Sequence, residues 1–92
     1  MSALAGTEVP RLPRGVRLRA DAVRGGHVLL APERSFELDA VAAAVLALVD
    51  GVRTVGEIAA TLALRFNADP ATIEADVADM LGDLVAKRVV EL

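Results

Sequence analysis

A segment in which arginines alternate with apolar residues precedes three segments of helical pattern, and this order most constrains the fold. Residues 16–20 alternate with a period of two, which is typical of a half-buried strand. Gly25-Gly26 suits a tight turn, residues 27–31 form a more apolar strand, and residues 35–38 alternate again. The pattern predicts an α+β fold similar to a winged helix-turn-helix, with a small three-stranded antiparallel sheet followed by three helices.

Capping residues and apolar faces predict the three helices. Asp39, Thr54 and Asp69 each precede a helical pattern, as N-caps do. A glutamate three residues after Thr54 completes a capping box, Pro70 occupies a first helical position, and Asp50-Gly51 ends the first helix. The third helix should run to about Lys87. The residues that we expect the first two helices to bury are Val41, Ala44, Val45 and Leu48, then Val55, Ile58, Ala59, Leu62 and Phe66.

The length of 92 residues suits one small domain. Pro10, Pro13 and Gly15 interrupt the first residues, so we expect residues 1–15 to be an extended, partly mobile tail and residues 16–92 to be the folded domain. The chain has no cysteine, no secretion signal and no apolar run near the roughly 20 residues that span a bilayer. We expect a cytoplasmic protein without membrane contact, either a monomer or a domain-swapped homodimer.

Charge is distributed unevenly along the chain. Residues 1–34 hold six arginines and three acidic residues, a net charge of +3, whereas residues 35–92 hold four basic and ten acidic residues, a net charge of −6. A winged helix that binds DNA normally carries positive charge on its recognition helix, because neutralised phosphates supply most of the affinity. The acidic helical half therefore excludes nucleic acid as the expected partner.

The side chains offer no combination that is typical of catalysis or of a metal site. His27 is the single histidine and has no metal-ligand or acid–base partner at a suitable spacing, and Ser35 has no recognisable triad. Asp76, Asp79 and Asp83 share one helical face. Acidic residues grouped in this way usually form a solvent-exposed surface and not a metal site. We expect a protein that is not an enzyme and that needs no metal and no cofactor.

Two features suit the binding of an extended peptide. The short strand at residues 35–38 would offer free backbone groups if it lay at the sheet edge, unless the tail or a second copy of the chain covered it. The third helix carries a stripe of small side chains that includes Gly82, which costs about 1 kcal/mol relative to alanine inside a helix. Close packing of another helix and a shallow peptide groove are both consistent with this stripe, which consists of Ala75, Ala78, Gly82 and Ala86.

Several segments in a fixed order resemble the PqqD family. The more specific ones are Leu29-Leu30 followed by Pro32-Glu33, and Asp50-Gly51 followed by Thr54, although wider families of peptide-recognition domains share the second. Ala31 departs from the family pattern, where a larger and often aromatic residue is expected, so no stacking contact is implied there. The remaining matches are Pro10, residues 14–18, Asp21, Arg24, Val28, Leu38, Leu46, Glu57-Ile58, Leu62, Asp76-Val77, Leu81 and Leu84.

The resemblance implies a peptide chaperone of pyrroloquinoline quinone (PQQ) biosynthesis. Such a domain binds the precursor peptide PqqA and presents it to PqqE, a radical S-adenosylmethionine enzyme. Members of this type usually take the leader of the peptide as an added strand beside the third strand, against the third helix. Carried onto this chain, the strand is Arg34, Ser35, Phe36, Glu37 and Leu38. From the stripes of the third helix, the expected opposing residues are Ala75, Ala78, Asp79 and Gly82, with Val77 and Leu81 beneath them.

Other interpretations of the same sequence remain open. The domain could bind the finished quinone or a late intermediate and so assist a biosynthetic enzyme, although an aromatic or basic pocket would be needed and only two aromatic residues are present. A solvated strand face is the simplest interpretation of the arginine cluster. The alternative is a surface that faces the enzyme, formed by Arg14, Arg17, Arg19 and Arg24.

Overall fold

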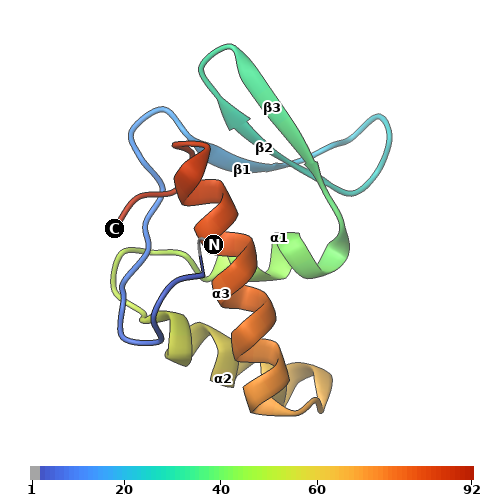
Figure 1. Ribbon diagram of the computed structural model, residues 1–92. Coiled ribbons are helices and arrows are strands. Elements are labelled where there is room, and N and C mark those ends of the chain that lie inside the picture. Colours follow the sequence, from blue (N-terminus) through green and yellow to red (C-terminus); the bar gives the residue numbers. More distant parts are fainter. Residues whose placement is uncertain (1–2) are drawn as a thin grey trace.

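The computed structural model describes residues 3–92 and shows a small sheet above three helices (Figure 1). The strands β1 (Arg17–Ala20), β2 (His27–Ala31) and β3 (Arg34–Leu38) come first, followed by the helices α1 (Ala40–Ala47), α2 (Val55–Phe66) and α3 (Pro70–Ala86). The predicted α+β fold, a three-stranded antiparallel sheet followed by three helices, is confirmed.

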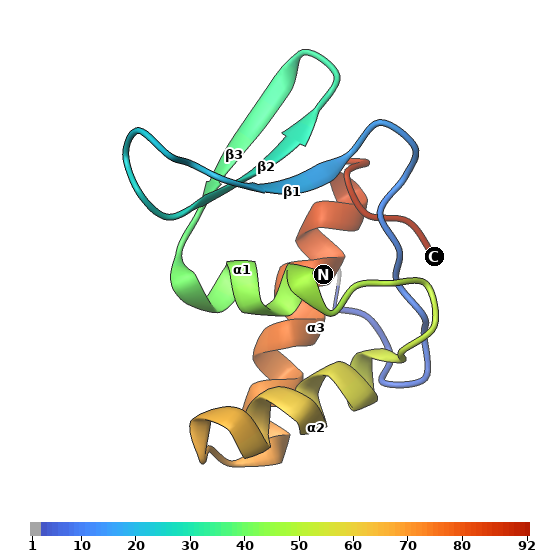
Figure 2. The ribbon, with the colours of Figure 1, turned by 180° about the vertical axis from the view of Figure 1, so that it is seen from behind.

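The sheet has the order β1-β2-β3 and two chemically different faces. Leu18 lies opposite Leu29, and Leu29 lies opposite Phe36, so an apolar row crosses the inner face and packs on the core. Side chains alternate between the faces of a strand, which places Arg17 and Arg19 on the outer face. None of the helices in residues 3–92 covers this outer face in either view (Figure 2).

Side-chain caps begin all three helices as the sequence predicts. Asp39 accepts the N–H of Ala42 at 2.8 Å, and Asp69 accepts the N–H of Thr72 at 3.1 Å, with a proline in the first turn of α3. α1 ends at Ala47, earlier than the predicted stop at Asp50-Gly51. After the helix, the side chain of Asp50 organises a separate turn.

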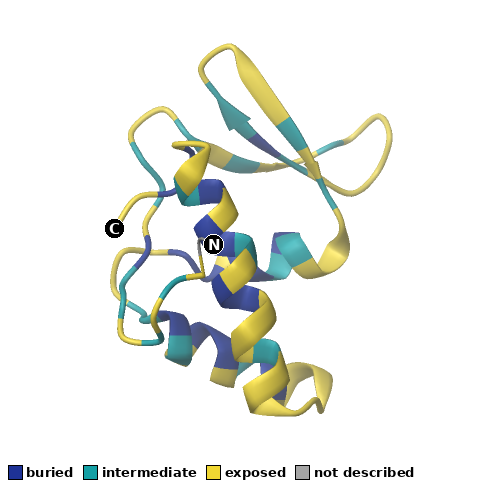
Figure 3. Cartoon of the chain, in the orientation of Figure 1, coloured by how far each residue is buried: buried dark blue, intermediate teal, exposed yellow. Residues whose placement is uncertain are grey.

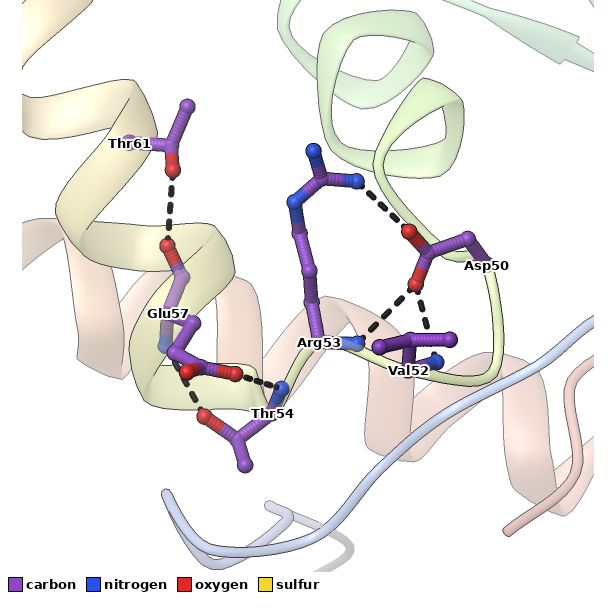
Figure 4. A network of polar contacts seen from close by, with 6 residues as sticks. All are labelled: Asp50, Val52, Arg53, Thr54, Glu57 and Thr61. Atoms are coloured by element: carbon purple, nitrogen blue, oxygen red, sulfur yellow. Dashed lines mark hydrogen bonds and ion pairs between the residues drawn. The ribbon is translucent and has the colours of Figure 1, made fainter.

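This turn, between α1 and α2, is shown in Figure 4. Asp50 Oδ1 accepts the backbone N–H groups of Val52 and Arg53 at 2.9 and 3.0 Å, and Oδ2 pairs with the Arg53 guanidinium at 2.6 Å. Thr54 Oγ1 then accepts the N–H of Glu57 at 3.0 Å, and the Glu57 carboxylate accepts the N–H of Thr54 at 2.8 Å. The Asp-Gly-x-x-Thr motif therefore forms one tight turn and the start of one helix.

Acid should weaken this turn. The backbone N–H of Arg53, the N–H of Val52 and the charge of Arg53 lower the pKa of the Asp50 carboxyl below its ordinary value. The charged carboxylate therefore adds stability above the unfolded-state pKa, and this stability is lost as the pH falls through the lowered folded-state pKa. Asp50→Asn keeps an acceptor oxygen but takes up no proton, so we expect it to lose less stability than the wild type between neutral pH and about pH 3. Urea unfolding at both pH values measures this difference, and equal losses would contradict it.

Apolar residues from the helices and from β2 form the core, which appears dark blue in Figure 3. Leu29, Val55, Ile58, Leu81 and Val89 are completely buried. The prediction that Val41 and Phe66 are buried is wrong, because these side chains are 58% and 50% exposed. Val41 lies in the first turn of α1 and Phe66 at the last residue of α2, where the helices diverge and leave a hollow between them.

The segment before β1, expected to be a tail, lies along the helices within the described residues. A Cβ added to Gly56 would lie 3.3 Å from the Gly6 carbonyl oxygen, so glycine in the first turn of α2 permits close approach of this segment. The first N–H groups of a helix lack partners inside the helix, and the segment supplies partners to two of them. Its carbonyls at Gly6, Glu8 and Pro10 accept the N–H groups of Gly56, Val55 and Gly51 at 2.9, 2.8 and 3.1 Å.

The same segment reaches the other end of the chain. Arg11 and Glu91 form an antiparallel bridge with two backbone hydrogen bonds of 2.8 and 2.9 Å, and their side chains form an ion pair at 2.9 Å. Val89 and Val90 are buried beside this bridge, so the last residues pack on the domain. The mobility expected for residues 1–15 stays a prediction, and its first two residues lie outside the described part of the chain.

Candidate functional site

One edge of β3 has no partner strand in the described part of the chain. The order β1-β2-β3 places β3 at the border of the sheet, and the backbone hydrogen bonds of residues 4–11 go to the helices, to the turn before α2 and to Glu91 instead of to this border. The two-residue turn Pro32-Glu33 makes Ala31 and Arg34 the hydrogen-bonded pair that closes the hairpin. Such pairs alternate along antiparallel strands, so the backbone groups of Ser35 and Glu37 point away from β2, toward the open edge.

The side chains of β3 divide between the two faces. Phe36 and Leu38 are half-buried on the inner face and pack against the core. Arg34 shares that face, and its guanidinium carbon lies 5.6 Å from the centre of the Phe36 ring. Ser35 and Glu37 are exposed on the outer face, where Glu37 forms an ion pair with Arg24.

An apolar hollow lies where the three helices diverge, close to the end of β3. Its volume is about 70 Å³. Val41, three residues after the last residue of β3, forms part of its border, so the open edge and the hollow are neighbouring features. Its lining combines one charged residue with seven apolar ones: Val41, Val45, Leu62, Phe66, Ile73, Asp76, Val77 and Met80.

The predicted residues of α3 fall on two sides of the helix. Val77 lines the apolar hollow, whereas Ala75 and Ala78 line a different depression together with Leu4 of the N-terminal segment. The N–H of Leu4 donates to the carbonyl of Ala78 at 3.2 Å. The N-terminal residue Leu4 therefore lies on the side of α3 that carries Ala75 and Ala78. Leu81 and Gly82 are buried, and Asp79 is exposed.

Sequence reasoning missed the apolar hollow. Val41 and Phe66 were expected in the core, so neither was considered as a binding residue. The available signal was an excess of apolar positions at the ends of the first two helices. No local pattern, however, shows that two helix ends diverge in space.

Two arginines of the predicted enzyme-facing cluster, Arg17 and Arg19, lie on the outer face of the sheet. In the register of the sheet, Arg17 lies opposite Leu30 and Arg19 lies opposite Val28. The half-buried side chains of Val28 and Leu30 therefore lie between these two arginines and β3. Arg14 and Arg24 are exposed loop residues, and the charge of Arg24 is paired with that of Glu37.

Residues 3–92 contain neither a cluster of metal-binding side chains nor a helix that is long and apolar enough to cross a membrane. His27 is exposed at the start of β2. The arrangement of the described residues therefore suits strand pairing along β3 and apolar contact in the hollow.

Comparison with known sequences identifies one family and several relatives. The family model described as coenzyme PQQ synthesis protein D (PqqD) matches residues 26–90. The chain is 61% identical over 90 residues to the bifunctional coenzyme PQQ synthesis protein C/D of Methylorubrum extorquens, with 98% of this chain aligned but only 24% of that longer protein. It is 46% identical over 92 residues to the PqqA binding protein of Xanthomonas oryzae, and the match covers both chains completely.

Two solved structures share the fold. The solution structure of the PqqD part of Methylobacterium extorquens PqqCD, described as a functional and stand-alone recognition element for ribosomally synthesized and post-translationally modified peptides, is 60% identical. The match has a TM-score of 0.87 and covers 99% of this chain and 97% of that chain. The crystal structure of PqqD from Xanthomonas campestris is 43% identical, with a TM-score of 0.63 and coverage of 97% and 99%.

Proposed function

The chain belongs to the PqqD family, and we propose that it is a non-catalytic peptide chaperone that binds the precursor peptide PqqA and presents it to the radical S-adenosylmethionine enzyme PqqE. The PqqA binding proteins of Xanthomonas oryzae, which match the chain over its whole length, support the first part of this proposal. The open edge of β3 is the structural observation that carries it.

The added strand would pair with the backbone of β3. The N–H and C=O groups of Ser35 and Glu37 face the open edge at alternate positions, as a further strand requires. Such backbone bonds give affinity that depends little on the peptide sequence, whereas pockets for alternate side chains give selectivity.

The apolar hollow is the candidate pocket. A peptide strand that runs past the end of β3 would reach Val41, which already exposes 58% of its surface. A space of about 70 Å³ bordered by Phe66 and Met80 suits part of one apolar side chain, which would cover these residues from water. Val77 connects this pocket with the part of α3 that the sequence predicted. The roles of Ala75, Ala78, Asp79, Leu81 and Gly82 stay predictions.

Direct titration tests the proposal. The chain contains no tryptophan and no tyrosine, so a tryptophan-containing or dye-labelled PqqA peptide gives a signal free of background from the protein. Saturable binding would support the proposal. No binding at tens of micromolar, roughly −6 kcal/mol, would contradict it. Saturable binding of the quinone alone would favour the product-binding alternative.

For the second partner, the outer face of the sheet is the candidate surface for PqqE. It is the basic part of a chain whose helical half is acidic, and it lies on the face of the sheet opposite the core. Charged side chains at the border of an interface mainly affect the association rate and its salt dependence.

Charge reversal separates this surface from the peptide site. We expect Arg17→Glu combined with Arg19→Glu to weaken the complex of protein, peptide and PqqE by about tenfold or more, because two favourable charges become unfavourable ones. Affinity for the peptide alone should not change, since both arginines lie on β1 rather than at the edge of β3. Sedimentation measures the ternary complex, and fluorescence titration measures the binary one. Parallel loss of both complexes would contradict this division.

A further inference from the structure

Arg34 occupies an unusual position beside the proposed peptide site. It lies two residues before Phe36 on β3, so both side chains project from the inner face of the sheet. The guanidinium carbon is 5.6 Å from the centre of the Phe36 ring, a distance at which a cation is attracted to an aromatic face. The ring therefore holds a charged group close to the open edge.

This charge has no acidic partner among the described residues. The ion pairs of residues 3–92 involve Arg11, Arg24, Arg53 and Lys87, and none involves Arg34. Arg17 and Arg19 lie on the outer face, so Arg34 is the one arginine that the three described strands place on the inner face. A guanidinium presents several N–H donors in a planar arrangement that matches a carboxylate.

We propose that Arg34 selects peptides in which an acidic side chain lies on the inner face of the sheet. In such a peptide, an apolar side chain two residues away on the same face contacts Phe36. The inference rests on the proposed function, because it requires a peptide strand on the edge of β3. Residues directly opposite each other in neighbouring antiparallel strands project to the same face. The peptide residue opposite Arg34 and the one opposite Phe36 are therefore two positions apart and share the inner face.

The chemistry of Phe36 and Arg34 indicates which side chain each of the two peptide positions would carry. Opposite Phe36, the peptide side chain would meet the half-buried ring and the core beneath it, which favours an apolar residue. Opposite Arg34, it would meet an exposed cation, which favours a carboxylate. An exposed pair of this kind contributes modestly, so we expect its loss to weaken binding by about three- to tenfold.

A double-mutant cycle tests the proposal on the full chain. The probe is the PqqA peptide, with each glutamate replaced in turn by glutamine and each aspartate by asparagine, titrated against the wild type and against Arg34→Gln. We expect one of these peptides to bind the wild type about three- to tenfold more weakly than native PqqA. The same peptide and native PqqA should bind Arg34→Gln equally well. Arg65→Gln, an exposed change outside the residues that line the hollow, serves as the matched control and should behave like the wild type.

The outcomes distinguish this proposal from the proposed function. If native PqqA binds the wild type but no peptide shows coupling to Arg34, the proposed function stands and this inference is overturned. If native PqqA does not bind the wild type at all, both are overturned. Arg34→Glu paired with a peptide that carries lysine at the identified position should recover affinity relative to either change alone, and failure to recover would overturn a direct charge contact.

Discussion

Replacing Ser35 with proline should weaken PqqA binding by about tenfold or more while the domain stays folded. The Ser35 N–H points to the open edge of β3, so proline removes a donor that the peptide would use and none that β2 uses. A peptide carbonyl left without its donor costs about 1–3 kcal/mol, and each 1.4 kcal/mol corresponds to about tenfold in affinity. Fluorescence titration with labelled PqqA measures the loss.

Two control variants make this result specific. Ser35→Ala removes the hydroxyl but keeps the N–H, so its affinity should match that of the wild type. Phe36→Pro removes an N–H that bonds to β2, and we expect it to destabilise the hairpin itself. A folded Ser35→Pro variant that binds PqqA as tightly as the wild type would rule out strand addition at this edge.

Replacing Leu62 with alanine should remove much of the stability of the domain. Leu62 is 1% exposed at the centre of the helical core. Truncation of a buried leucine costs about 2–5 kcal/mol, because the lost contacts leave a cavity. Small domains are stable by only about 5–15 kcal/mol in total, so we expect Tm to fall by about 10 °C or more.

Leu64 offers a matched control on the same helix. It is 86% exposed and two residues away from Leu62, so Leu64→Ala should change the free energy of unfolding by less than about 0.5 kcal/mol. Thermal and urea unfolding compare the two variants. Similar losses in both would mean that Leu62 is not packed as the structure describes.

Local signals in the sequence predicted much of the fold. The caps at Asp39, Thr54 and Asp69 are hydrogen bonds between residues three positions apart, so a short stretch of sequence contains both partners. The alternation of β3 likewise predicted that Phe36 and Leu38 pack inward while Ser35 and Glu37 face outward. Its position at the edge required the pairing of all three strands.

Contacts between distant parts of the chain account for what the sequence did not predict. Leu4 meets Ala78, and Arg11 meets Glu91, although neither segment shows a strand or helix pattern that predicts its partner. The small residues of α3 suggested close packing or a groove, and the structure places the N-terminal segment beside two of them. The hollow at Val41 depends on where helices end in space, which no local periodicity records.

The bridge between Arg11 and Glu91 fixes the last residues of the chain against the N-terminal segment, and its hydrogen bonds and ion pair involve no residue of β3. An enzyme attached by a flexible linker after the last residues would therefore be held on the side of this bridge, and the edge of β3 would stay accessible. A linker of suitable length raises the effective concentration of the attached partner to the order of millimolar. Such attachment would turn a weak encounter between two molecules into an intramolecular one, with no change at the peptide site.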